Sequence, residues 1–224
     1  MIKIGKIIAY LFFLLLPFHS LGQLLSKSKP IKFLALGDSY TIGESVEENL
    51  KWPNQLSDAL SKKGFQIKRP KIIATTGWRT DNLKDAVKAA GLKEEYSLVS
   101  LLIGVNNQYQ GRSVQQYGPE FKDLLLTAIK LAKGKKENVF VVSIPDYGYT
   151  PFGKPKQAEI SKAIDQFNEI NKSITVNMGI KYVSITDISR LGLDKPDLVA
   201  EDGLHPSGKM YSMWVERILQ TLVK

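Results

Sequence analysis

Residues 31–41 read Ile-Lys-Phe-Leu-Ala-Leu-Gly-Asp-Ser-Tyr-Thr, and this stretch decides the fold class. Its first six residues form a compact, mostly apolar run that Gly37 ends, which predicts a buried β-strand followed by a turn. Four later segments have the same character, being nearly continuous in apolar or β-branched residues rather than alternating: 71–75, 98–103, 139–144 and 182–185. Continuous runs of this kind are typical of parallel strands that are covered on both faces.

Segments with helical spacing separate these runs. Apolar residues recur at intervals of three and four in 121–132, 160–178 and 211–222, and shorter helical patterns cover 52–63 and 82–90. Pro119 is expected in the first turn of its helix, where the missing N–H costs little. Strand–helix alternation from end to end predicts one α/β domain, built as a three-layer α/β/α sandwich around a parallel sheet.

The composition excludes several kinds of chemistry. Of the 224 residues, 43% are hydrophobic and 24% are charged, which is a globular composition. The absence of cysteine excludes disulfides, thiolate nucleophiles and a lipoprotein anchor. His19 and His205 are the only histidines, which is too few for the usual zinc set, so we expect no metal and no cofactor.

The first 22 residues have the pattern of a secretory signal peptide. Lys3 and Lys6 precede an apolar run over 7–18, and the small residues Ser20 and Gly22 follow where a signal peptidase reads the chain. The run is short for a membrane-spanning helix, although an uncleaved N-terminal anchor is the alternative. We therefore expect cleavage near Gly22, with export to the periplasm or the exterior and no stable membrane anchor. A linker over 23–30 and one folded domain over 31–224 would follow.

The chain is basic, with a net charge of +9. Loss of residues 1–22, which carry two lysines and no acid, would lower it to +7. Such a charge can attract nucleic acids, anionic lipids or acidic glycans. The lysines are scattered, however, and no zinc finger, ribonucleoprotein motif or arginine-rich helix accompanies them. The sequence therefore predicts no nucleic-acid partner.

Short polar motifs follow the predicted strands. In open parallel sheets, ligands bind at the carboxyl ends of the strands, so these motifs are the place to look for a site. Each one taken alone could be an ordinary turn or a helix cap. The motifs are Gly37-Asp38-Ser39, the glycine of Thr75-Thr76-Gly77-Trp78, Gly104-Val105-Asn106-Asn107, and Asp202-Gly203-Leu204-His205 ahead of the last helix.

Together these motifs contain the parts of a serine hydrolase, which needs a nucleophile, a base, a carboxylate that orients the base, and oxyanion donors. Ser39 lies at a predicted strand-to-helix turn, where its Oγ can stand clear of the backbone. His205 is the only imidazole beyond the signal segment, and Asp202, three residues earlier, can reach its Nδ1. The backbone N–H groups of Ser39 and Gly77 and the amide of Asn106 could converge on one oxygen, and Gly77 has no Cβ to hinder a substrate.

This set resembles the SGNH, or GDSL-type, hydrolase superfamily of esterases, lipases and acylhydrolases. The name-giving residues match in the family's order as Ser39, Gly77, Asn106 and His205. The resemblance assigns the hydrolase domain to 31–224 and implies a flavodoxin-like three-layer sandwich. It also implies hydrolysis of carboxylic esters, often on lipids or acetylated sugars. Asn107 stands where the family usually has an acid, so it must support its loop through neutral hydrogen bonds.

Two other classes of function stay open at this point. One is a catalytically inactive secreted binding protein on the same fold, which would recognise a glycan or a lipid surface. The other is a basic exported protein that binds anionic polymers or lipid surfaces. The presence of Ser39, Asp202 and His205 together favours the hydrolase, because a decayed site would usually have lost one of them.

The substrate is expected to be a small-molecule, glycan or lipid ester. The segments 43–51, 107–118 and 146–156 should rim its pocket, because they follow strand ends or the nucleophile. Their aromatic side chains could stack on a sugar ring or surround an acyl chain. These aromatic residues are Tyr109, Tyr117, Tyr147, Tyr149 and Phe152.

Overall fold

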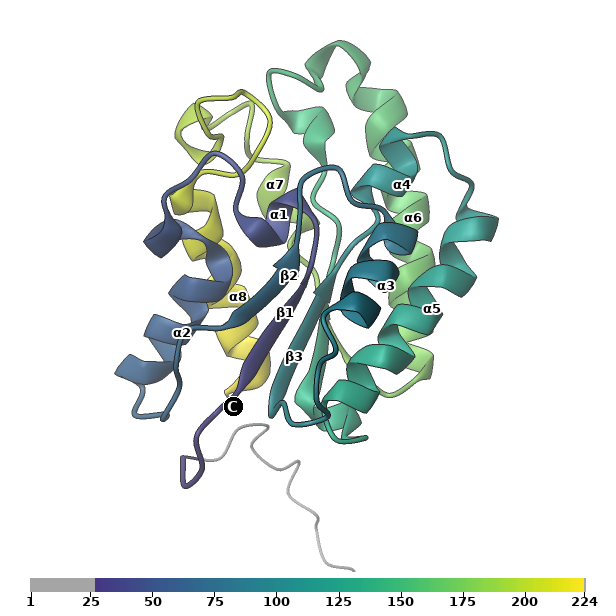
Figure 1. Cartoon of the computed structure of the whole chain (residues 1–224). Helices are drawn as coiled ribbons and strands as arrows, with labels where there is room; N and C mark the ends of the chain where they lie inside the picture. The colour runs from purple at the N-terminus through teal and green to yellow at the C-terminus, as the bar shows by residue number, and fades with distance from the viewer. Residues whose placement is uncertain (1–26, 224) are drawn as a thin grey trace, which may run out of the picture.

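The computed structural model describes residues 27–223, so the predicted signal peptide and the first part of the linker lie outside the described residues. Its strands form one parallel sheet in the order β2-β1-β3-β4-β5 (Figure 1). This is the strand order of flavodoxin-like sheets, and the predicted three-layer α/β/α sandwich is confirmed. The strands are β1 (Phe33–Gly37), β2 (Lys71–Ala74), β3 (Leu98–Leu102), β4 (Val139–Val142) and β5 (Lys181–Val183).

The burial of the strands follows their position in the sheet. Every residue of the three central strands β1, β3 and β4 is buried, because helices cover both faces there. The edge strands β2 and β5 are partly exposed. Pairing of Gly37 with Ala74 on one side and Leu102 on the other aligns the carboxyl ends of β1, β2 and β3.

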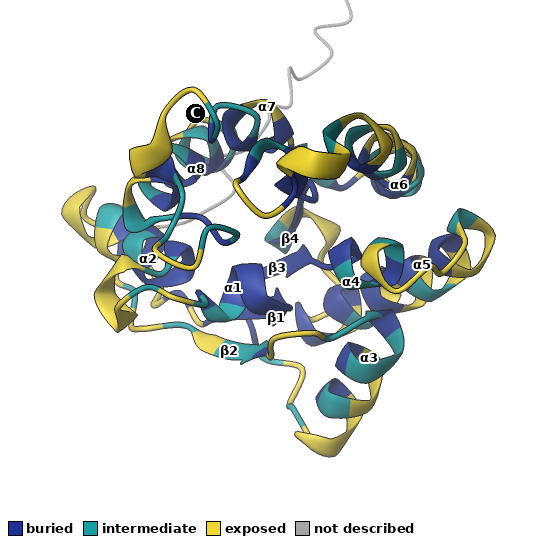
Figure 2. Cartoon of the chain, turned by 90° about the horizontal axis from the view of Figure 1, so that it is seen from above, coloured by how far each residue is buried: buried dark blue, intermediate teal, exposed yellow. Residues whose placement is uncertain are grey.

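Helices form the two outer layers (Figures 1 and 2). One layer holds α2 (Trp52–Lys62) and α8 (Gly208–Leu222), and the other holds α3 (Thr80–Ala89), α5 (Val114–Leu131) and α6 (Gln157–Asn177). Short helices occupy the connections: α1 (Ser39–Ile42), α4 (Val105–Tyr109), α7 (Thr186–Ser189), and the 3₁₀ turns η1 (Glu48–Leu50), η2 (Lys136–Asn138), η3 (Tyr147–Tyr149), η4 (Lys154–Lys156) and η5 (Pro196–Leu198).

The expectation for Pro119 is wrong. Helix α5 begins earlier than the apolar stripe indicates, because the Ser113 side chain caps it by accepting a hydrogen bond from the Gln116 N–H at 3.2 Å. Pro119 therefore lies inside the helix. Its neighbour Gly118 packs closely on α6, where an added Cβ would lie 3.3 Å from Ile170.

The carboxyl ends of the strands meet at one edge of the sheet. Viewed from above, α1 lies in the centre of this edge, with α4 and α6 on one side and α8 on the other (Figure 2). Segments that are far apart in the chain therefore gather around α1. Over residues 27–223, no helix combines the length and the apolar character that a membrane span requires.

Candidate active site

Ser39 is placed by a tight turn between β1 and α1. The turn requires glycine at position 37, since a Cβ there would lie 2.2 Å from Thr41 Oγ1 and 2.5 Å from the Leu102 carbonyl oxygen. Asp38 then caps α1, and its Oδ1 accepts a hydrogen bond from the Tyr40 N–H at 3.1 Å. Ser39 follows as the first residue of the helix and lines a cavity above the sheet.

This cavity, of about 340 Å³, brings together residues from four parts of the chain. Ser39 comes from the end of β1, Gly77 from the loop after β2, Asn106 from α4 and His205 from the loop before α8. The structure thus places the four residues that give the superfamily its name around one space. No hydrogen bond joins the Ser39 hydroxyl to the His205 imidazole, and such bonds are often long or unformed in a site without substrate.

Asp202 binds the imidazole of His205 at its Nδ1 atom. His205 Nδ1 lies 2.6 Å from Asp202 Oδ2, while Asp202 Oδ1 accepts the backbone N–H groups of Leu204 and His205, each at 2.9 Å. Ser45 donates a further hydrogen bond to Oδ2 at 2.6 Å. A carboxylate can only accept, so the proton of the neutral ring stands on Nδ1, and Nε2 is left to act as the acceptor.

The same contacts keep Asp202 ionised. Partial burial by itself would raise the pKa of its carboxyl. The hydrogen bonds from Ser45, from the His205 ring and from the two backbone N–H groups outweigh this effect and hold the pKa well below its usual range.

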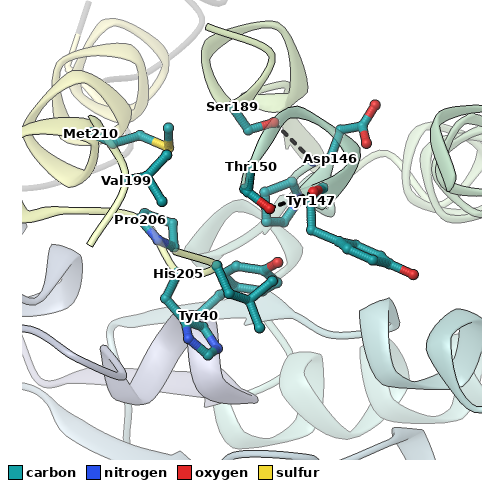
Figure 3. A pocket seen from close by; sticks show the side chains of 11 residues that line it. Tyr40, Asp146, Tyr147, Thr150, Ser189, Val199, His205, Pro206 and Met210 are labelled. Atoms are coloured by element: carbon teal, nitrogen blue, oxygen red, sulfur yellow. Dashed lines mark hydrogen bonds between the residues drawn. The ribbon is translucent and has the colours of Figure 1, made fainter. Parts of the chain in front are cut away.

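The loop that carries His205 is pinned on its other side as well. Ala200 N–H donates to the His205 carbonyl at 2.7 Å, and Val199 forms an isolated antiparallel bridge with Pro206. The rings of His205 and Tyr40 meet edge to face, with centroids 5.7 Å apart. Figure 3 shows both rings beside a small hollow of about 10 Å³, which is at the lower limit for one water molecule. Packing therefore leaves the imidazole little freedom to turn.

The predicted oxyanion donors also adjoin one another. Gly77 has a φ of +83°, which strongly favours glycine, and open space surrounds the position of a Cβ. Within residues 27–223, neither its backbone N–H nor that of Ser39 has a hydrogen-bond partner. One amide hydrogen of Asn106 donates to the Trp78 carbonyl at 3.0 Å, and this leaves the second one for a ligand. The cavity thus offers three free donors beside a hydroxyl.

Comparison with known proteins decides the family. The model of the GDSL-like lipase/acylhydrolase family matches residues 35–213. The chain belongs to this family.

Its relatives include enzymes named as esterases. The chain is 27% identical to a multidomain esterase of Ruminococcus flavefaciens, over 97% of this chain and 32% of that protein, and so spans about a third of it. It is 25% identical to an arylesterase of Vibrio mimicus, over 86% of this chain and 88% of the relative. A lipolytic protein of the G-D-S-L family from Veillonella parvula shares the fold, with a TM-score of 0.67, 16% identity and coverage of 85% and 97%. The GDSL protein described here is a carboxylic ester hydrolase.

Asn107, the departure from the usual GDSL pattern, is buried, and both its amide oxygen and its amide nitrogen form a hydrogen bond. Its Oδ1 accepts the Thr80 N–H at 3.1 Å, and its Nδ2 donates to Thr80 Oγ1 at 2.7 Å. The Thr80 hydroxyl donates in turn to Glu120 on α5. The expectation that Asn107 supports its loop through neutral hydrogen bonds is confirmed.

The aspartate of the Gly-Asp-Ser motif is a buried acid without a cation partner. Asp38 has no exposed surface, and its Oδ2 makes no hydrogen bond of good geometry. Burial raises the pKa of Asp38 to about 7, although the N–H groups of Tyr40 and Gly104 near the carboxyl act in the opposite direction.

The rim of the cavity agrees only in part with the expected one. Tyr109, Tyr147 and Phe152 line the cavity, whereas Tyr117 lies in the core and donates its hydroxyl to the Ile103 carbonyl at 3.0 Å. Tyr149 also lies outside the lining, and so does the whole of 43–51.

Segment 43–51 contributes a different functional residue, Ser45, which binds Asp202 and has an unusual φ of +62°. A lone loop serine has no motif that could have identified it. No motif marks Gln110 either, whose amide donates to the Gly77 carbonyl at 3.2 Å. The described chain, residues 27–223, shows no group of three or more His, Cys, Asp or Glu side chains that could hold a metal ion.

Proposed function

We propose that this GDSL protein is an exported serine esterase that works through an acyl-enzyme, with Ser39 as the nucleophile, His205 as the base and Asp202 as the residue that orients it. The observation that carries the proposal is the hydrogen bond of 2.6 Å between Asp202 and His205, because His205 lines the same cavity as Ser39. It fits the geometry by which a carboxylate sets the tautomer of a catalytic histidine.

The first half of the reaction forms the acyl-enzyme. Nε2 of His205 takes the proton of Ser39 as Oγ attacks the ester carbonyl, and the carbonyl oxygen becomes an oxyanion. The N–H groups of Ser39 and Gly77 and the free amide hydrogen of Asn106 donate to that oxyanion. The imidazolium then gives its proton to the leaving alcohol as the carbon–oxygen bond breaks. Asp202 stays ionised and stabilises the imidazolium.

The second half repeats these steps with water. His205 takes a proton from a water molecule, whose oxygen attacks the acyl-enzyme, and then returns the proton to Ser39 as the carboxylic acid leaves. No step in this sequence requires a cofactor.

Labelling with a fluorophosphonate tests the proposal. Such probes phosphonylate only a serine whose hydroxyl is activated, so the protein should be labelled once, on the peptide that contains Ser39. Ser39→Ala should abolish labelling and lower the hydrolysis of p-nitrophenyl acetate by about 10⁴-fold or more, because the residues of such a triad act as a unit. The half-buried Ser207, which caps the N-terminus of α8, offers a control: Ser207→Thr should change neither readout. Activity of Ser39→Ala within tenfold of the unaltered enzyme would overturn the mechanism.

Export is part of the same proposal. It is supported by Lys3, Lys6 and the apolar run over 7–18, all of which lie outside the described residues. Expression of the full chain in a bacterial host should yield a periplasmic or extracellular form whose N-terminus begins near Gln23. Retention of the intact chain in the membrane fraction would show an uncleaved anchor instead.

A further inference from the structure

The cavity beside Ser39 is the first of three adjoining hollows. A second hollow of about 480 Å³ shares Tyr109, Tyr147 and Phe152 with it and extends to η4 and the start of α6. A third, of about 670 Å³, shares Gln108 and Gly111 with the second and lies between the start of α5 and the middle of α6. We call the second and third hollows together the outer groove. Because they share these residues, the three hollows adjoin one another, and together they extend well beyond the space that a small ester needs.

Aromatic rings stand at the border between the catalytic cavity and the second hollow. The ring centroids of Tyr109, Tyr147 and Phe152 lie 6.1–6.4 Å from one another, so the three rings form one cluster. Tyr109 is 59% exposed and Phe152 is 51% exposed, which is unusual for side chains of this size. Tyr147 is held in place by the hydrogen bond from its hydroxyl to Gln108 Oε1 at 2.9 Å. The three packed rings therefore form an exposed aromatic surface that a ligand can contact.

Beyond the rings, the wall of the second hollow combines the apolar Pro155 and Ile160 with charged side chains. Lys156 of η4 and Glu159 of α6 line it, and within the described residues neither side chain forms an ion pair or a hydrogen bond. The third hollow is mixed in the same way, with the polar residues Arg112, Gln115, Gln166 and Glu169 beside the apolar residues Val114, Ala163, Phe167 and Ile170. An alkyl chain laid along this wall would remove water from charged groups without replacing the lost hydrogen bonds. A chain of sugar rings would place C–H faces on the aromatic cluster and hydroxyl groups against the polar side chains.

We propose that the outer groove binds the alcohol part of the substrate, and that this alcohol is an oligomeric carbohydrate. The inference rests on the proposed esterase function. The ester-bearing unit lies at Ser39, and the neighbouring units cross the aromatic cluster and contact Lys156 and Glu159. Binding energy from such remote units improves catalysis by holding the ester in place, so the enzyme should prefer acetylated oligosaccharides to an acetylated monosaccharide.

The test compares a small ester with esters of increasing length. The substrates are p-nitrophenyl acetate, which fits the catalytic cavity alone, and chemically acetylated mono-, tri- and hexasaccharides of the cello- and xylo-series. With the unaltered enzyme, kcat/KM for release of acetate should rise by about tenfold or more from monosaccharide to hexasaccharide in at least one series, mainly through KM. The double variant Lys156→Ala/Glu159→Ala should lose most of this rise and keep its activity on p-nitrophenyl acetate within about twofold.

Lys154→Ala is the matched control, because Lys154 lies on the same turn, η4, and does not line the groove. It should leave all substrates unaffected. Equal kcat/KM at every sugar length, or a rise that survives in the double variant, would overturn the proposal. So would a preference for longer acyl chains among p-nitrophenyl esters that the double variant abolishes, since the groove would then hold the acyl part. Hydrolysis of p-nitrophenyl acetate by Ser39→Ala would contradict the proposed function instead, which keeps the two failures apart.

Discussion

At the scale of single residues, the two aspartates near the nucleophile have opposite electrostatic surroundings. Asp202 receives hydrogen bonds from Ser45, His205 and the backbone, which lower its pKa and keep it charged beside the imidazole. Asp38 is buried with one oxygen unpaired, which raises its pKa to about 7. The two carboxyl groups therefore favour different protonation states at neutral pH.

The raised pKa of Asp38 should make stability depend on pH. In the unfolded chain this carboxyl titrates near 3.8, so between about pH 4 and 7 the folded protein binds more protons than the unfolded one. The free energy of unfolding should consequently fall as the pH rises through that window, by at most about 4 kcal/mol from this group. Asp38→Asn keeps an oxygen for the Tyr40 N–H and cannot ionise, so this contribution to the fall should vanish.

Urea unfolding at pH 5, 6, 7 and 8 measures the effect. All other groups titrate alike in both proteins, so the stability of Asp38→Asn relative to the unaltered protein should increase from pH 5 to pH 8. If the free energy of unfolding changes with pH by the same amount in both proteins, the folded-state pKa of Asp38 is close to its unfolded value.

At the scale of elements, α4 connects the parts of the site. Consecutive side chains on this short helix contact different partners: Asn106 binds the Trp78 carbonyl, Asn107 binds Thr80, Gln108 accepts from Tyr147, and Tyr109 joins the aromatic cluster. The turn after β3 thereby ties the oxyanion donors to the outer groove. Its support comes through Asn107 and Thr80 to Glu120 on α5.

The donors and acceptors in these hydrogen bonds predict what happens when Asn107 is replaced by the acid that is usual in the GDSL family. In Asn107→Asp the new carboxylate can no longer donate to Thr80, so the Thr80 hydroxyl must turn toward it and abandon Glu120. A buried charge and a lost hydrogen bond should lower the free energy of unfolding by about 1–3 kcal/mol. Activity should change little, because neither Asn107 nor Glu120 lines the cavity.

Glu120→Gln should compensate for this loss of stability. In the double variant the Thr80 hydroxyl donates to the new aspartate, and its oxygen can accept a hydrogen bond from the amide of the new glutamine. In a double-mutant cycle, Asn107→Asp/Glu120→Gln should recover about 1 kcal/mol relative to the sum of the single variants. Simple additivity would show that the chain of hydrogen bonds does not couple the two positions. A large gain in kcat for Asn107→Asp would mean instead that the native loop holds Asn106 poorly.

At the scale of the whole molecule, the site depends on both ends of the chain. Ser39 follows the first strand, while His205 precedes the last helix, and α8 reaches the site through ring contacts. Trp214 is fully buried, and its ring centroid lies 6.4 Å from that of Tyr40. The ring of Tyr40 in turn contacts His205. Folding of α8 onto α2 and the sheet is therefore a condition for assembling the site.

Trp214→Ala should lower the free energy of unfolding by about 3–5 kcal/mol, which is typical for a large aromatic residue in a core. For a chain of this size, that corresponds to a decrease in Tm of roughly 6–20 °C. Trp214→Phe should cost much less, because it fills most of the space and removes an indole N–H that has no partner within the described residues. Circular dichroism and residual esterase activity, followed on the same heating series, should show coincident transitions for all three proteins. Loss of activity well below the Tm would show that the His205 loop unfolds on its own.

The sequence by itself determined the class of fold and the identity of the central site residues. Short continuous apolar runs that alternate with helical patterns favour parallel strands covered on both faces, and motifs at the carboxyl ends of such strands meet at one edge of the sheet. For this reason the sequence predicts that Ser39, Gly77, Asn106 and His205 surround one space, and in the structure they line one cavity. The apolar stripe places the start of α5 too late in the chain, because a cap at Ser113 is a weaker signal than the stripe.

Only the tertiary structure decided which residues support and extend that site. Ser45 reaches Asp202 across 157 positions of the chain, and Tyr117 turns into the core while Tyr109 faces the cavity. The groove beyond the aromatic cluster is likewise formed by segments that share no motif. Side-chain direction and contacts between distant segments depend on how the layers pack, and packing is a property of the folded chain that no local pattern contains.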